Sequence, residues 1–151
     1  MYRGTSEFFE NGLVKNIYLE VARKPKDTDP YIHEIVDEWF YSHFGVKARS
    51  QTIFCSLSKD MASKFITATG GLYRITIPCE EKYSIIFSEY VDDFYDIMRE
   101  LNYPYEASEI TDLLSNKNYI IVDNIKDVPM DFKGELMLFV ENYHVERVTN
   151  V

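Results

Sequence analysis

The sequence predicts an α+β fold in a single compact domain over residues 1–151. The length suits one domain, since globular domains commonly hold roughly 100–200 residues. Segments with the apolar spacing of helices gather early and in the middle of the chain, whereas strand-like segments close it, which predicts an antiparallel sheet with flanking helices. Hydrophobic residues make up 46% and charged residues 27%, so the composition excludes disordered, collagen-like and coiled-coil proteins.

The first thirty residues predict a strand, a helix and a connection. Residues 2–5 form a short opening strand and turn. Apolar side chains then recur every four residues and predict one face of a helix, weakened by Gly12. These side chains are Phe9, Leu13, Ile17 and Val21. Residues 23–29, with Pro25 among several charged neighbours, predict a polar connection.

The clearest helix signal follows this connection. Asp29 is a plausible N-cap residue, Pro30 fits the first helical position, and Gly45 predicts the end. One apolar stripe lies between them at helical spacing. It consists of Ile32, Ile35, Val36, Trp39 and Phe40.

The middle of the chain predicts three strands around one helix. Residues 52–55 form a strand that leads to Ser58, a candidate N-cap residue, and Gly70-Gly71 ends the helix after it. The apolar residues of this helix are Met61, Ala62, Phe65 and Ile66. Residues 72–77 alternate apolar and polar side chains, which is typical of a half-buried strand, and residues 83–87 form another strand.

The last third predicts two helices and three strands. Ser88 is a candidate N-cap for the first helix, and a shorter helix starts after Ser108. The apolar face of the first helix consists of Val91, Phe94, Tyr95, Met98 and Leu101. Strands are predicted over residues 119–122, 135–140 and 143–148, and the Glu141-Asn142 pair predicts a tight antiparallel hairpin between the last two.

Charge and cysteine content restrict the partners and the compartment. The chain has 16 Lys and Arg against 25 Asp and Glu, a net charge of −9, which repels phosphate backbones and disfavours nucleic acid as a partner. Cys55 and Cys79 lack zinc-ligand spacing and follow no secretory leader, so we expect two unlinked thiols in a reducing cytosol. No run approaches the roughly 20 apolar residues of a membrane span, so we expect a soluble, cytoplasmic protein.

Several common catalytic motifs are absent from the sequence. It contains no Walker loop, no dinucleotide-binding glycine motif, no G-x-S-x-G and no H-E-x-x-H. His33, His43 and His144 are not spaced as a metal-ligand set, so we expect satisfied or surface histidines and no metal site.

Three short motifs follow one another along the chain. Tyr2-Arg3-Gly4 stands near the start, Ser56-Leu57-Ser58 precedes a helix with Ala62 and Phe65, and Glu135 opens the segment E-L-M-L-F. In this order they resemble the arginine–serine–glutamate branch of the ADP-ribosyltransferases, which has Y-R-G, S-T-S with A-x-x-F, and E-V-L-F. The resemblance covers nearly the whole chain and implies an ADP-ribosyltransferase-like split antiparallel sheet, with NAD as the cofactor.

The resemblance also implies roles for these residues. Glu135 stabilises the positive charge that develops on the ribose when its bond to nicotinamide breaks, and Ser56 orients Glu135 or the ligand. Arg3, between Tyr2 and Gly4, clamps a phosphate or a ribose edge. The alternatives are an exposed acid at a strand start for Glu135 and a surface arginine for Arg3.

Other polar residues near these motifs have two interpretations each. Ser58 either contacts the cofactor or only caps its helix. Arg49 and Ser50 stand just ahead of the same strand and form an alternative donor pair for an anion. Residues 23–26 hold Arg23, Lys24 and Lys26, which form either an anion-binding loop or a solvated charged turn.

A second set of motifs resembles small proteins of phages. Those proteins carry R-K-P-x-D-T, W-F-x-x-x-F-G and R-S-x-x-x-F-C, which stand here at residues 23–28, 39–45 and 49–55. Together the two resemblances imply a phage-encoded, NAD-dependent ADP-ribosyltransferase-like protein in the cytosol of a bacterial host. Its acceptor would be a host macromolecule, and the negative charge favours a protein over a nucleic acid.

Two departures from the ADP-ribosyltransferase pattern support a second hypothesis. Lys133 stands two residues before Glu135, where enzymes that modify arginine carry Glu or Gln, and a cation there repels an incoming guanidinium. The Y-R-G motif begins at residue 2, without the N-terminal helices that usually support the cofactor. The alternative is a catalytically inactive relative that binds a host or defence protein through an acidic surface.

Overall fold

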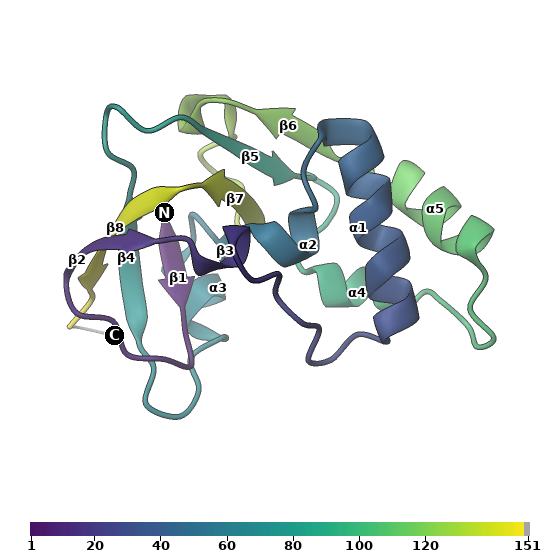
Figure 1. The fold of residues 1–151 in the computed structure, drawn as a ribbon, viewed down its shortest axis with the longest axis horizontal. Coiled ribbons are helices and arrows are strands. Elements are labelled where there is room, and N and C mark those ends of the chain that lie inside the picture. The colour runs from purple at the N-terminus through teal and green to yellow at the C-terminus, as the bar shows by residue number, and fades with distance from the viewer. Residues whose placement is uncertain (150–151) are drawn as a thin grey trace.

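Eight strands form two four-stranded antiparallel sheets in residues 1–149, which are the residues that the computed structural model describes (Figure 1). The first sheet has the order β1 (Tyr2–Gly4), β4 (Leu72–Thr76), β8 (Asn142–Arg147) and β2 (Gly12–Lys15). The second sheet has the order β3 (Ile53–Cys55), β7 (Leu136–Val140), β5 (Tyr83–Phe87) and β6 (Ile120–Val122). The predicted α+β class, with antiparallel sheets in one compact domain, is confirmed.

Five α-helices and two 3-10 helices connect these strands within the same residues. They are α1 (Pro30–Phe44), α2 (Ala48–Gln51), α3 (Lys59–Ser63), α4 (Phe94–Met98), α5 (Ala107–Ser115), η1 (Ile17–Leu19) and η2 (Ile125–Asp127). Helices α1, α4 and α5 lie at one end of the molecule, on the right in Figure 1, while α3 packs against β1, away from that end. The second sheet therefore separates the helical end from the first sheet.

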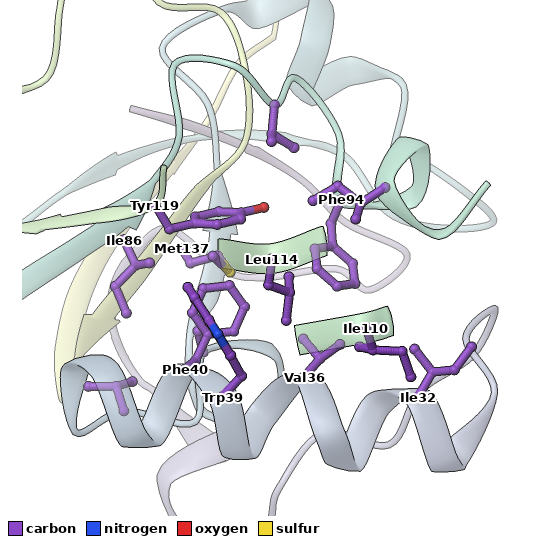
Figure 2. Close-up of a cluster of buried hydrophobic side chains, with 14 residues drawn as sticks. Ile32, Val36, Trp39, Phe40, Ile86, Phe94, Ile110, Leu114, Tyr119 and Met137 are labelled. Carbon is purple, nitrogen blue, oxygen red and sulfur yellow. The ribbon is translucent and has the colours of Figure 1, made fainter. Parts of the chain in front are cut away.

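The two faces of the second sheet contribute to two separate hydrophobic clusters. Ile86 and Met137 face the helical end and pack with α1, α4 and α5 (Figure 2). Their strand neighbours Ile85 and Leu138 point the other way, to a cluster with Tyr73 and other residues of the first sheet. Alternate side chains of a strand point to opposite faces, so both faces of this sheet can be buried.

Helix α1 confirms its sequence prediction from end to end. The Asp29 side chain accepts a hydrogen bond of 2.8 Å from the Tyr31 N–H, Pro30 is the first helical residue, and Gly45 takes a left-handed conformation with φ 73° at the end. The apolar stripe packs into the first cluster as expected. The strands predicted near residues 2–5, 52–55, 72–77, 83–87 and 119–122 are also present.

The helix predicted over the Phe9–Val21 spacing is wrong, because this segment forms β2 and η1. Gly12 has φ 142°, which a helix does not contain. Leu13, Ile17 and Val21 remain 61%, 58% and 70% exposed, so their four-residue spacing is not a buried face. Asn16 is the buried residue here, and its side chain caps η1.

The predicted hairpin between the last two strands is also wrong. β7 pairs with β3 and β5, whereas β8 pairs with β2 and β4, so the chain crosses from one sheet to the other at Glu141. The Asn16 N–H donates to the Glu141 carbonyl at 2.7 Å, and its side-chain amide donates to the Val140 carbonyl at 3.0 Å. Asn16, which is distant in sequence, thus supplies hydrogen-bond donors to the carbonyls of Val140 and Glu141, where the chain crosses between the sheets.

Two helix boundaries differ from the prediction. Helix α4 begins at Phe94 and is capped by Asp93, which accepts from the Tyr95 N–H at 2.9 Å. Ser88 instead accepts from the Tyr90 N–H at 3.1 Å and donates to the Lys117 carbonyl, so it stabilises a turn. Ser58 does cap α3, but this helix is short and ends before Phe65.

The remaining general expectations concern thiols, metals and membranes. Cys55 and Cys79 are unlinked, as expected. Residues 1–149 contain no cluster of three or more His, Cys, Asp or Glu side chains suited to a metal ion. None of the helices described is both long enough and apolar enough to traverse a bilayer.

Candidate functional site

A cavity of about 870 Å³ lies where β1, β3 and the start of β7 meet. Six of the predicted site residues line it: Tyr2, Arg3, Gly4, Arg49, Ser56 and Glu135. Ser50 and Ser58, the other two, are not among its lining residues. A smaller hollow of about 410 Å³ near Leu72 and Arg147 contains none of the eight.

Strand register brings the three sequence motifs together at this cavity. β3 pairs with β7 so that Cys55 lies opposite Leu136, and one residue further along stand Ser56 and Glu135. Ser56 also pairs with Tyr2 through reciprocal main-chain hydrogen bonds of 2.8 and 2.9 Å, which join β1 to β3. The neighbours of one residue, Ser56, therefore come from both ends of the chain.

The Ser56 side chain holds the segment that precedes β7. It is 3% exposed, and its hydroxyl donates to the Lys133 carbonyl at 2.9 Å and accepts from the Ser58 N–H at 3.1 Å. A Cβ added at Gly134 would lie 2.7 Å from the Val91 carbonyl oxygen, so glycine allows this segment to run against the loop before α4. These contacts fix the position of Glu135.

Several motif residues also have structural roles. A Cβ added at Gly4 would lie 2.0 Å from the Ala62 carbonyl oxygen, so glycine permits the close packing of α3 on β1. Ser58 caps α3 by accepting from the Met61 N–H at 3.2 Å. Ser50 is buried, and its carbonyl accepts a hydrogen bond from the Arg23 N–H at 3.0 Å.

Arg3 reaches from β1 past the intervening strand β4 to a side chain of β8. Its guanidinium donates to the Tyr143 hydroxyl at 2.8 Å and lies 5.8 Å from the centre of the Phe9 ring. Burial raises the pKa of Tyr143, so this hydroxyl stays neutral at physiological pH. The partner of the Arg3 guanidinium is therefore an uncharged hydroxyl.

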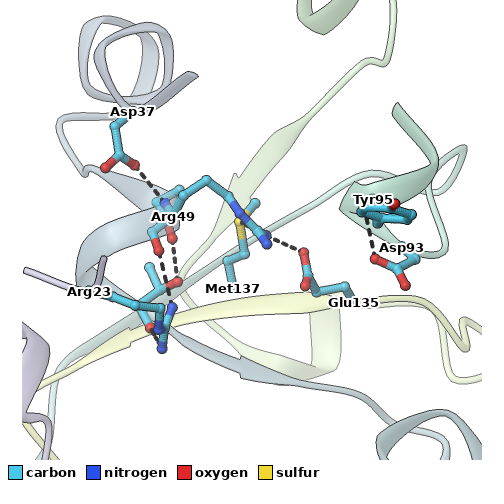
Figure 3. Close-up of polar contacts among 9 residues, drawn as sticks. Arg23, Asp37, Arg49, Asp93, Tyr95, Glu135 and Met137 are labelled. Carbon is cyan, nitrogen blue, oxygen red and sulfur yellow. Dashed lines mark hydrogen bonds and ion pairs between the residues drawn. The ribbon is translucent and has the colours of Figure 1, made fainter. Parts of the chain in front are cut away.

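Arg49 and Glu135 form an ion pair in the cavity wall (Figure 3). The pair joins the Arg49 Nη1 atom to the Glu135 Oε1 atom, and the two side chains are 14% and 12% exposed. The same Nη1 atom lies 3.4 Å from the Met137 sulfur. The Arg49 N–H donates to a carboxylate oxygen of Asp37 at 2.7 Å, which anchors α2 to α1.

Aromatic rings hold the guanidinium of Arg49 and that of Arg23. Arg49 lies 4.0 Å from the centre of the Phe54 ring and 4.2 Å from that of Phe94. Arg23 lies 3.9 Å from the Phe54 centre and 4.0 Å from that of Tyr18. We call these five side chains the stacked cluster. Cation–π contacts of this kind restrain the planes of both guanidinium groups.

The sequence pattern does not indicate most of the stacked cluster. It predicts Arg23 only as part of a charged loop, yet this guanidinium donates to the carbonyls of Arg49 and Thr52 at 3.1 and 2.8 Å and so supports α2. Burial lowers the pKa of Arg23, but an arginine keeps its charge at any physiological pH. The motif R-S-x-x-x-F, which contains Arg49 and Phe54, was the available signal.

The lining of the cavity differs in charge from the whole molecule. Six cationic side chains line it: Arg3, Arg23, Lys24, Lys26, Arg49 and Lys64. The five carboxylates are those of Glu7, Asp27, Asp92, Asp93 and Glu135. The lining thus carries a net charge of +1, whereas the chain carries −9. The charge of the lining therefore opposes an anionic ligand less than the overall charge of the chain does.

Two further titratable groups line the cavity. His33 Nε2 lies 3.4 Å from a carboxylate oxygen of Asp37, and burial lowers the pKa of the imidazole, which favours its neutral form. Burial raises the pKa of the Cys55 thiol to about 11, so this cysteine is protonated at neutral pH and is not a nucleophile.

Comparisons of this chain with protein-family models, with curated proteins and with solved structures found no match.

Proposed function

We propose that this chain is an NAD-dependent ADP-ribosyltransferase-like enzyme that binds NAD in the cavity and transfers ADP-ribose to a host macromolecule. The single observation that carries the proposal is that Arg3, Ser56 and Glu135, from three separate segments, line one cavity. Its volume lies within the range of roughly 300–1,000 Å³ that is typical of small-molecule sites.

The reaction assigns a different task to each residue. The bond between nicotinamide and C1 of the ribose breaks, nicotinamide leaves with the bonding electrons, and positive charge develops on the ribose. The Glu135 carboxylate stabilises this charge. An acceptor nucleophile then forms a bond to C1 and loses its proton to solvent. Arg3 donates to the diphosphate, and Ser56 holds the segment that carries Glu135.

Charge favours a protein acceptor over a nucleic acid. A net charge of −9 repels a polyanion at the surface, while the cationic lining still attracts a small anion such as a dinucleotide. Lys133, two residues before Glu135, is exposed and repels an arginine side chain. We therefore propose an acceptor other than arginine, and water would take the same position in NAD hydrolysis.

The ion pair with Arg49 supports the second candidate function, an inactive relative that binds a host or defence protein through its acidic surface. A carboxylate beside a guanidinium is partly neutralised and stabilises a cationic ribose less well. If the pair stays closed when a ligand is present, the fold has lost transfer activity.

Calorimetry with NAD and an assay of released nicotinamide test the proposal. Glu135→Gln should retain NAD binding but lose turnover by a factor on the order of 10²–10³, because the carboxylate acts on charge that develops in the transition state. Arg3→Ala should weaken NAD binding, whereas Arg74→Ala, an exposed arginine outside the cavity, should alter neither. If the wild-type protein neither binds NAD nor releases nicotinamide with host lysate present, the enzyme proposal is wrong and binding of a host or defence protein is the remaining function.

A further inference from the structure

The Arg49–Glu135 pair is largely buried yet borders an open cavity. Removing two charges from water costs free energy that their attraction rarely exceeds, so such a pair adds little to net stability. One member of the pair, Glu135, is the residue that the proposed reaction requires, which suggests a functional explanation for the pair. We propose that Arg49 receives a phosphate group of the ligand, and that this phosphate takes the guanidinium away from Glu135 and frees the carboxylate.

The contacts of Arg49 suit an exchange of partners. Its main chain is fixed at both ends, by Asp37 at the N–H and by Arg23 at the carbonyl. The flat guanidinium lies against Phe54 and Phe94, so the rings restrain its plane and leave its N–H edge for an anion. A guanidinium has five N–H donors in a planar fork, which matches phosphate at least as well as carboxylate.

The exchange of partners changes how strongly Glu135 acts on the ribose. While Arg49 is paired with it, the carboxylate acts on a ribose cation against the field of an adjacent positive charge. A ligand phosphate that engages Arg49 balances this positive charge, so Glu135 faces the ribose with its full effect. Binding of the phosphate and activation of the carboxylate are then one event.

The exchange defines a class of ligand. A diphosphate-bearing nucleotide can open the pair, whereas an uncharged or cationic nucleoside cannot, since it offers Arg49 no anion. This part of the inference rests on the proposed function, because only cleavage of a glycosidic bond requires Glu135. The phosphate receptor itself does not depend on any reaction.

Calorimetric titration with inorganic pyrophosphate and with ADP-ribose tests the receptor without turnover. Arg49→Met keeps the apolar stem between the rings but removes the donors, and we expect its Kd to rise about 10- to 100-fold, the loss of a charge-assisted contact. Glu135→Gln removes the competitor for Arg49, so its Kd should fall several-fold below that of wild type. Arg74→Met, a matched loss of one exposed arginine outside the cavity, should bind like wild type.

The outcome for Glu135→Gln distinguishes exchange from a structural role. If Glu135 only held Arg49 in place, its loss would weaken anion binding or leave it unchanged. Circular dichroism and thermal unfolding establish that each variant is folded, and Arg49→Met tests the same receptor if Glu135→Gln fails to fold. Wild type that binds neither probe, or Arg49→Met that binds as wild type does, overturns the inference.

Nicotinamide release from NAD separates this inference from the proposed function. Release by a protein whose pyrophosphate affinity does not depend on Arg49 supports the enzyme and refutes the exchange. The expected order of pyrophosphate affinities without any release supports the phosphate receptor and refutes the transferase. Neither result can be read as support for both.

Discussion

The two sides of the cavity hold an arginine in different ways. On one side, Arg3 extends from β1 to a neutral tyrosine hydroxyl. On the other side, Arg49 lies between two aromatic rings and is paired with a carboxylate. An anion gains Arg3 without breaking an ion pair, whereas it must displace Glu135 to gain Arg49. The comparison shows that the same side chain can serve as a simple binding group or as one that couples binding to a second residue.

The two arginines also differ in the contacts that support them. Asp37 of α1 and the guanidinium of Arg23 hold the main chain of Arg49, and the Phe54 and Phe94 rings restrain its guanidinium. Arg3 relies on a three-residue edge strand and on the packing of α3 beneath it. We therefore expect substitutions on the Arg49 side to alter stability more than those on the Arg3 side.

The largest expected effect on stability comes from breaking the ion pair. Glu135→Met leaves the Arg49 charge without its partner and should lower the free energy of unfolding by about 2–4 kcal/mol. The double variant Arg49→Met with Glu135→Met replaces both charges by apolar side chains beside Phe54 and Phe94 and should recover most of that loss. Urea unfolding of the four proteins of this cycle measures the coupling. Strictly additive single and double variants would show that the two charges do not interact.

A smaller loss of stability is expected from changing the contact between β1 and α3, next to Arg3 in the chain. Gly4→Ala brings a Cβ to 2.0 Å from the Ala62 carbonyl oxygen, so α3 must move away from β1. We expect a loss of about 1–3 kcal/mol of unfolding free energy, the usual range for overpacking. Gly71→Ala is the matched control, because its nearest atom, at 3.3 Å, belongs to the flexible Arg147 side chain. Equal stability of the two variants would mean that α3 is not held by this contact.

The Cys55 thiol reports the charge of both sides. Burial raises its pKa to about 11, the guanidinium of Arg3 lowers the pKa, and the Glu135 carboxylate raises it. In a Cys79→Ser background, thiolate absorbance measured against pH should show a higher pKa in Arg3→Met and a lower one in Glu135→Gln. The same thiol pKa in both variants would show that the charges of Arg3 and Glu135 do not act on Cys55.

The same thiol gives the stability a pH dependence. Between the ordinary thiol pKa of 9.0 and about 11, the folded protein keeps a proton that the unfolded chain loses. The native state therefore binds more protons, and the free energy of unfolding falls as pH rises through this window, by on the order of 2 kcal/mol. Urea unfolding between pH 8 and pH 11 should show this fall, and Cys55→Ala should show a shallower one.

The smallest expected effect is the loss of the neutral partner of Arg3. Tyr143→Phe removes one hydrogen bond and should cost about 1 kcal/mol of stability. It leaves the Arg3 charge in place, so the affinity for pyrophosphate should change less than twofold. A tenfold loss of affinity would show that the hydroxyl positions Arg3 for the anion.

Local patterns predicted the parts of the fold that depend on neighbours in sequence. Asp29, Pro30 and Gly45 define α1 by chemistry within a few residues, and this helix is found as expected. The chain crosses from β7 to β8 at a point where its carbonyls accept from Asn16, more than 120 residues away, and no spacing near Glu141 could have shown this contact. The helix predicted from Phe9 to Val21 was wrong because a four-residue spacing of apolar side chains does not by itself show that another element packs against them.

The candidate site was predictable only in part, for the same reason. The order of the motifs selected Arg3, Ser56 and Glu135, which line one cavity, but it did not indicate that Glu135 has an arginine partner. Arg49 reaches it because β3 pairs with β7, a contact between residues 86 positions apart. The interpretation of Ser58 as a helix cap needed only its own helix and is confirmed.

One ratio tests the coupling of phosphate binding to Glu135 most directly. It is the kcat/KM for nicotinamide release from NAD divided by that from nicotinamide riboside, which has the same glycosidic bond but no phosphate. We predict a large ratio for wild type and a ratio lowered about 10-fold or more in Arg49→Met, because that variant loses the phosphate contact and frees Glu135 for both substrates. The same ratio in wild type and Arg49→Met would contradict the account.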